Sequence, residues 1–250
     1  MTKTLFLAWQ DHLKTHGWYP IGRLDADPSA QAYSFRYVRG AERARTEAGF
    51  KPLESFPQLA ETYTSKELFP IFLNRVLSRG RSDFNEWVEQ LALSPETADP
   101  IDLLSLSGGA RQTDSLEVFP KIEPQADGGF KCRFFLHGTH HLNDNARERI
   151  KRLETGEQLQ VAVELNNPVT DLALQLQTGN NDYYVIGWAP RYLINDFFRA
   201  ISQTQSKLLA HVVRLNPEPA PSKQRVLIEI QGILPPGYQP MTDGDYQLLN

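Results

Sequence analysis

Three of the six histidines and the single cysteine are the first candidates for chemistry in this 250-residue chain. His137, His140 and His141 lie close together, five to nine positions after Cys132. If the segment is a strand, His137 and His141 share one face, and His140 and Cys132 lie on the other. Because zinc needs three or four convergent ligands, this arrangement predicts no metal site. We expect no cofactor.

Other patterns that could support catalysis point the same way. Cys132 has Lys131 and Arg133 beside it, but no general base is identifiable nearby. The chain contains neither a G-x-S-x-G nucleophile motif nor a P-loop, and Ser107-Gly108-Gly109 is typical of a turn that ends a helix. The sequence therefore predicts a protein that is not an enzyme. An enzymatic function would require a pocket with convergent titratable groups.

The net charge of −4 argues against a protein that coats duplex DNA by charge alone. The basic residues are nevertheless clustered. Three groups stand out: Arg36, Arg39, Arg43 and Arg45; Arg75, Arg79 and Arg81; and Arg147, Arg149, Lys151 and Arg152. Solvated helix faces are the ordinary interpretation of such groups.

The sequence also predicts where the protein resides. A single cysteine excludes an intrachain disulfide framework and fits a reducing compartment. The chain lacks an apolar run of about 18 residues, and its start lacks the features of a signal peptide. We therefore expect a cytoplasmic protein without a membrane partner.

The first 120 residues have the pattern of a small α+β domain. Alternating apolar residues predict strands at TLFLAW, GWYPIGRL and AYSFRYVRG. The segment GFKPLESFPQL is expected to be an ordered loop. Helices are expected from about Pro70, after Ser82, and after Asp99-Pro100, where Asp99 caps the helix. SLEVFP is a further predicted strand.

The stretch KIEPQADGG concentrates proline, charge and a turn, so we place a boundary there, with domains at 1–120 and 121–250. The second domain is predicted to contain six strands and two helices. One helix is capped by Asn143 and the other begins at Pro190. The predicted strands are FKCRFFLHG, QLQVAVEL, LALQLQ, YYVIGW, KLLAHVVRL and RVLIEIQGIL.

The stretch from Phe134 to Ala200 carries a specific resemblance. It passes from FFLHGTHHL through GEQLQVAVELNNP to YYVIGWAPRYLINDFF. That order resembles the HIRAN domain, a small β-barrel module of nucleic-acid-processing proteins, over about 125–235. The resemblance implies an OB/SH3-like β-barrel with two helices, and a groove that takes the 3′ end of single-stranded DNA.

The resemblance also implies which residues line the groove. The family's basic and aromatic positions after the strand-ending glycine fall on His140 and His141, and its N-P corner on Asn167 and Pro168. The aromatic and acidic positions that follow hold Val169 and Thr170, with Asp171 one residue further on. The exit motif contains Trp188, either a stacking platform or a core residue, and Arg191, either a phosphate contact or a surface residue. Arg147 and Lys151 are expected to support these groove residues.

The front half has a resemblance of its own. LFPIFLNRVL, DPIDLLSLSGG and SLEVFP stand in the order found in the small N-terminal subdomain of HipA-type proteins. That family's chemistry lies in a kinase core. No lysine-bearing strand, catalytic-loop aspartate or metal-binding aspartate motif of kinase type follows here.

Two functions are therefore predicted. The first is a non-enzymatic protein that binds nucleic acid, with DNA as the expected partner, through the HIRAN-like barrel. It would recognise single-stranded, damaged or ended DNA in repair, plasmid maintenance or phage defence, with catalysis in a partner. The alternative is a protein-interaction module that docks on a separate HipA-type kinase or antitoxin, as in a toxin–antitoxin system.

Overall fold

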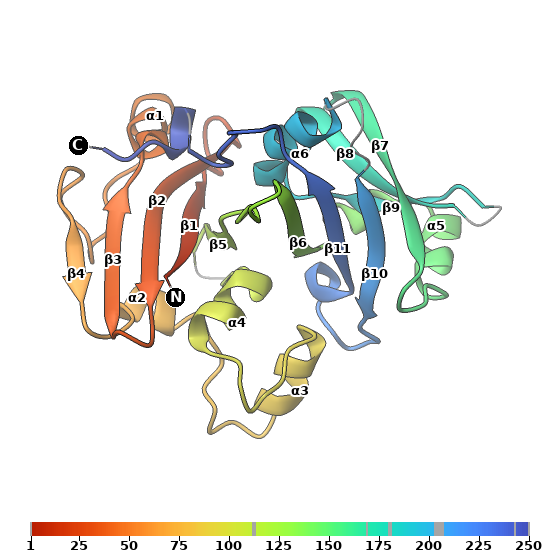
Figure 1. Cartoon of the computed structure of the whole chain (residues 1–250), viewed down its shortest axis with the longest axis horizontal. Helices are drawn as coiled ribbons and strands as arrows, with labels where there is room; N and C mark the ends of the chain where they lie inside the picture. The colour runs from red at the N-terminus through yellow and green to blue at the C-terminus, as the bar shows by residue number, and fades with distance from the viewer. Residues whose placement is uncertain are drawn as a thin grey trace. The chain divides into compact units, whose positions relative to one another are not determined.

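The chain divides into two compact units in the computed structural model (Figure 1). The structure describes residues 2–111, 114–168, 170–179, 182–202, 208–242 and 244–249. The first unit contains Met1–Val88, Leu93–Lys121 and Met241–Asn250, and the second contains Glu89–Ala92 and Ile122–Pro240. The chain enters the second unit after Lys121. The tail, which the sequence pattern places in the second domain, packs with the first unit.

The first unit is built on a five-stranded antiparallel sheet. Its order is β4-β3-β2-β1-β5. These strands span Lys3–Gln10 (β1), Trp18–Asp27 (β2), Ala32–Tyr37 (β3), Tyr63–Ser65 (β4) and Leu116–Pro120 (β5). The alternation that predicts β3 is confirmed, because Phe35 and Tyr37 are fully buried and Arg36 is not. The predicted strand SLEVFP is β5, which closes one edge of this sheet by pairing with β1.

Four helices accompany this sheet along the chain: α1 (Arg39–Ala48), α2 (Pro70–Leu73), α3 (Phe84–Gln90) and α4 (Pro100–Ser107). The predicted start of α4 is confirmed, since the Asp99 carboxylate accepts a hydrogen bond of 2.8 Å from the Asp102 N–H. Helix α1 is absent from the sequence-based prediction. Its buried face is made of Gly40, Ala41, Ala44 and Ala48, which give little apolar periodicity.

Aromatic rings fill the core of the first unit. Phe35 stacks on Phe56 with ring centroids 4.0 Å apart, and Phe72 packs at 5.9 Å. The C-terminal segment attaches to the same unit. Leu248 bridges to Val38, and Arg43 donates from Nε to both carboxylate oxygens of Asp245 and from Nη2 to Oδ2. These contacts explain why the tail belongs to the first unit.

The second unit is built on a six-stranded antiparallel sheet. Its order is β6-β11-β10-β7-β8-β9. The strands span Gly129–Phe135 (β6), Gln158–Asn167 (β7), Asp171–Thr178 (β8), Val185–Trp188 (β9), Leu209–Leu215 (β10) and Val226–Ile233 (β11). All six predicted strands are therefore confirmed. Beyond the strands, a single bridge pairs His137, just after β6, with Trp188 in β9.

The fold class α+β is confirmed, with two antiparallel sheets and six helices among the described residues. The strand pairing does not define a closed barrel, so the predicted barrel stays a prediction. Helices α5 (Asp144–Ile150) and α6 (Ile194–Ile201) match the two predicted ones. Short 3₁₀ turns are η1 (Thr139–His141), η2 (Arg191–Leu193), η3 (Ser222–Gln224) and η4 (Gly244–Tyr246). Within the described ranges, every helix is too short or too polar to cross a bilayer.

Candidate nucleic-acid interface

His140 and His141 lie on a 3₁₀ turn rather than on a strand. Strand β6 ends at Phe135, and Gly138 then takes a φ of 72°, which reverses the chain into η1. The His141 N–H closes the turn on the Gly138 carbonyl at 2.9 Å. The condition under which the histidines would alternate between two strand faces is therefore not met at His140 and His141. Both side chains are exposed, with ring centroids 3.8 Å apart.

Trp188 is fixed behind this turn. His137 and Trp188 exchange two backbone hydrogen bonds of 3.0 Å each. A Cβ atom on Gly138 would lie only 2.5 Å from Cε3 of the indole, so glycine is needed for the turn to approach the ring this closely. Trp188 is half-buried. One side of its ring therefore packs against the η1 turn, and part of the residue reaches solvent.

Glu164 connects Trp188 to the Asn167 corner. Its Oε2 atom accepts hydrogen bonds from Trp188 Nε1 at 2.6 Å and from Asn167 Nδ2 at 3.0 Å. Desolvation opposes ionisation, but the bonds from Trp188 and Asn167 outweigh it and hold the pKa of Glu164 below its ordinary value. The carboxylate is therefore charged at neutral pH. Sequence reasoning missed Glu164, which reads as one polar residue on the alternating strand β7.

The Asn167 corner is closed by its own side chain. Asn167 Oδ1 accepts from the N–H and the hydroxyl of Thr170, at 3.2 Å each. Thr170, which stands at the acidic position of the HIRAN pattern, thus supports Asn167. Asp171 begins β8 with an exposed side chain and a φ of 59°. Val169 lies outside the described residues.

One of the predicted cations, Arg147, contacts the η1 turn. Arg147, on α5, donates to the His140 carbonyl at 2.9 Å and to Asp144 at 3.2 Å. Arg191 opens η2, three residues after Trp188. Burial, with the charges of Lys223 and Arg191, lowers the pKa of His137. The residue as a whole nevertheless keeps an exposed surface.

Lys151 is directed to a different place. It follows the last residue of α5, one turn after Arg147, and donates to Glu148 at 2.6 Å. Lys151 lines a hollow with Leu215, Pro217, Glu218 and Arg225. The structure therefore links the predicted residues in three sets: His140 with Arg147, Trp188 with Asn167 through Glu164, and Lys151 with the hollow.

The structure also places the residues considered for metal binding and for nucleophilic attack. Within the part of the chain that the structure describes, no three His, Cys, Asp or Glu side chains gather in a way that could hold a metal ion. Cys132 is buried in β6. Burial, with the charges of Asp196 and Glu229, raises the pKa of its thiol to about 12, so the thiol stays protonated at neutral pH.

Comparison with known proteins leaves the family open. No family model matches the chain, and no curated protein does. A crystal structure of a protein from Lactobacillus plantarum aligns at 17% identity, with a TM-score of 0.33. The alignment covers 43% of this chain and 100% of the other. At this level the likeness carries no argument, and the HIRAN and HipA resemblances stay predictions.

Proposed function

We propose that the protein binds nucleic acid, with single-stranded or ended DNA as the expected ligand, through the surface formed by η1, β9 and α5. The observation that carries this proposal is the pair of exposed rings of His140 and His141, 3.8 Å apart, with the Arg147 guanidinium bonded to the same turn. Bases stack on exposed rings, and cations follow the backbone of a single strand. The two kinds of group lie side by side here.

The proposal includes a HIRAN-like barrel as the scaffold. It is supported by the paired hydrogen bonds between His137 and Trp188, because β6 and β9 are the two outer strands of the sheet. A bond between the continuation of one outer strand and the other outer strand is what a curled sheet requires. The barrel would place Trp188 and the η1 turn at its seam.

Recognition of a strand end is the finer part of the proposal. The resemblance implies an acidic residue that holds the terminal sugar, and Thr170 occupies its position. Glu164 offers a carboxylate from the neighbouring strand, next to Asn167. An ionised carboxylate repels phosphate but accepts a hydrogen bond from a sugar hydroxyl. We therefore assign Glu164, together with Asn167, the role of contacting a free hydroxyl end.

Binding of fluorescent oligonucleotides at two salt concentrations tests the proposal. We expect measurable affinity for a single strand at low salt, and a loss of affinity as salt rises, because phosphate contacts release counterions. Replacing His140 and His141 by alanine should weaken binding by about tenfold, since each stacked base contributes about 1–3 kcal/mol. Lys131→Gln removes an exposed cation on β6 and is the matched control, expected to bind as the wild type does.

A protein without measurable affinity for single- or double-stranded DNA or RNA at low salt would overturn the proposal. Equal binding by the double histidine variant would show that the η1 turn is not the contact. The alternative, a module that docks on a HipA-type kinase or antitoxin, stays a prediction without a specific structural observation in its favour. Pull-down with the products of neighbouring genes tests it.

A further inference from the structure

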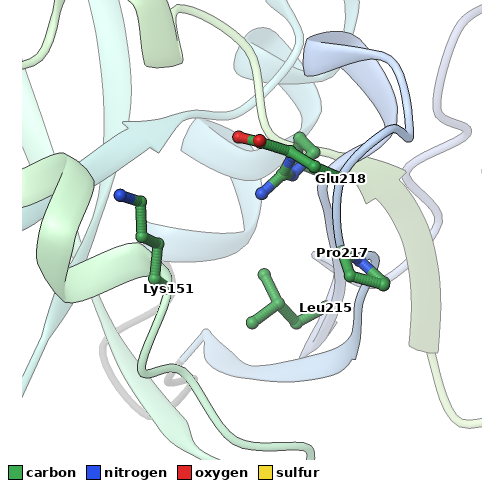
Figure 2. Close-up of a pocket in the computed structure, with 5 residues that line it drawn as sticks. Lys151, Leu215, Pro217 and Glu218 are labelled. Atoms are coloured by element: carbon green, nitrogen blue, oxygen red, sulfur yellow. The ribbon is translucent and has the colours of Figure 1, made fainter.

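A hollow of about 400 Å³ lies on the second unit, between the end of α5 and the connection from β10 to β11. Figure 2 shows Lys151 on the α5 side, with Leu215, Pro217 and Glu218 on the other. Arg225 completes the lining. The walls thus combine two cations and one carboxylate with two apolar side chains.

The Arg225 guanidinium has fewer partners than a mostly buried arginine normally has. Its side chain is 19% exposed, and its ion pair with Glu218 is long, at 3.4 Å. The Glu218 side chain is 81% exposed, so water competes for that pair. Within the described ranges, the buried Nε atom of Arg225 has no hydrogen-bond acceptor. Buried polar groups are nearly always hydrogen-bonded, so this donor indicates that an acceptor is missing.

The backbone holds Arg225 in place without help from its side chain. The fully buried Asn216 donates its N–H to the Arg225 carbonyl at 2.8 Å and its side-chain amide to the Gln224 carbonyl at 2.7 Å. On the facing wall, Lys151 is fixed at the end of α5, and its amine contacts the exposed Glu148. The fold therefore positions the backbones of both residues before any ligand arrives, which favours binding.

We infer that this hollow is a binding site for the terminal phosphate of a nucleotide. A phosphate monoester carries a charge of about −1.5 to −2 at neutral pH and three strong acceptor oxygens, which match the Lys151 amine and the Arg225 guanidinium. Leu215 and Pro217 give the sugar or base an apolar surface. Glu218 turns outward as phosphate replaces it beside Arg225. The inference rests on the proposed nucleic-acid binding for its ligand class, but not on the η1 surface.

The first experiment is an NMR titration of the full chain with a deoxynucleoside 5′-monophosphate, the same nucleoside without phosphate, and inorganic phosphate. We expect the monophosphate and inorganic phosphate to shift the signals of Lys151 and Arg225, and the nucleoside to leave them unchanged. Arg225→Gln and Lys151→Gln should each weaken binding of the monophosphate by about tenfold, as expected for a lost bond to a charged group. Lys131→Gln should bind as the wild type does.

Thermal unfolding of each variant checks that it is folded, and the exposed Lys151 is the safer of the two substitutions. Absence of monophosphate binding at millimolar concentration overturns the inference, as does equal binding by folded Lys151→Gln and Arg225→Gln.

A second experiment compares oligonucleotides with a 5′-phosphate and a 5′-hydroxyl. We expect the phosphorylated strand to bind more tightly. If single strands bind but the 5′-phosphate does not increase their affinity, the inference fails and the proposed function stands. If the monophosphate binds but no oligonucleotide does, the site stands and the proposed function fails.

Discussion

The two units use their charged side chains in different ways. In the first unit, Arg75 is almost fully buried and binds Asp114, the Gly109 carbonyl and the Ile71 carbonyl. In the second unit, Arg225 is also largely enclosed, yet its buried Nε atom finds no acceptor among the described residues. An arginine with complete internal bonding stabilises its unit. One with an incomplete set is available for a ligand.

Several arginines of the sequence clusters are bound internally, in both units. Arg36 binds Asp25 at 3.3 Å, Arg43 binds Asp245, and Arg79 donates to two carbonyls, of Pro95 and Ala98. These three therefore serve the first unit internally. In the second unit, Arg149 is likewise enclosed by Glu157 and Asp182. A run of cations in the sequence therefore does not show whether its side chains are available for a ligand. That depends on the partner of each one.

The largest expected effect concerns the buried pair of the first unit. Asp114→Ala leaves the Arg75 guanidinium, 2% exposed, without its carboxylate. We expect the free energy of unfolding to fall by about 3 kcal/mol, because an uncompensated buried charge remains. Asp83→Ala breaks the exposed pair with Arg81 and is the control, with an expected loss below about 1 kcal/mol. Denaturant unfolding measures both. Equal losses would remove the distinction between buried and exposed pairs.

The next effect concerns the glycine beside Trp188. Gly138→Ala adds a Cβ atom 2.5 Å from the indole at a φ of 72°, so we expect a loss of about 2 kcal/mol from crowding and strain. Gly156 has a φ of 87°, but an added Cβ atom would meet nothing within 4 Å. Gly156→Ala should therefore lower the free energy of unfolding by about 1 kcal/mol, from backbone strain alone. The indole N–H signal of Trp188 in NMR spectra should move in Gly138→Ala only. An unmoved signal would contradict the packing described for η1.

The smallest effect concerns a carboxylate that shapes a loop of the first unit. Asp11 accepts hydrogen bonds from the backbone N–H groups of Thr15, Leu13 and Lys14, and the first two of these are the main reason that its pKa is far below the ordinary value. Because the folded-state pKa is depressed, the stabilisation is present above the unfolded pKa of about 4 and is lost as pH falls below it.

Asp11→Asn should therefore reduce the stability difference between pH 6 and pH 3, compared with the wild type. Unfolding at the two pH values measures this. Asp144→Asn, which changes a carboxylate whose side chain is 95% exposed, is the control. If Asp11→Asn retains the full pH dependence of the wild type, the loop is held by other groups.

Local patterns in the sequence predict most of the strands, because alternation and turns are properties of neighbouring residues. Helix α1 escapes prediction because Val38 provides no side-chain cap and the buried face consists of alanines and Gly40. Gly40 is explained only by the fold, since a Cβ atom there would lie 2.0 Å from the Pro20 carbonyl.

The candidate site is harder to predict from the sequence than the strands are. The predicted strand FKCRFFLHG ends at Gly138, but the sequence does not show that Gly138 turns the chain so that His140 and His141 lie together on a 3₁₀ turn. The contact between Glu164 and Trp188 depends on the register of β7, β8 and β9. Lys151 and Arg225 are brought to one hollow only by the tertiary structure. Residue types indicate candidate cations and rings, but their combination depends on contacts between distant segments.

The return of the chain to the first unit has a consequence for biosynthesis. The ribosome releases residues 122–240, which contain the whole second sheet, before it releases Asp245 and Leu248. Arg43 and Val38 can contact those two residues only after that point in synthesis. The first unit, which contains strand β1, therefore acquires its last contacts only after residues 122–240 have been synthesised.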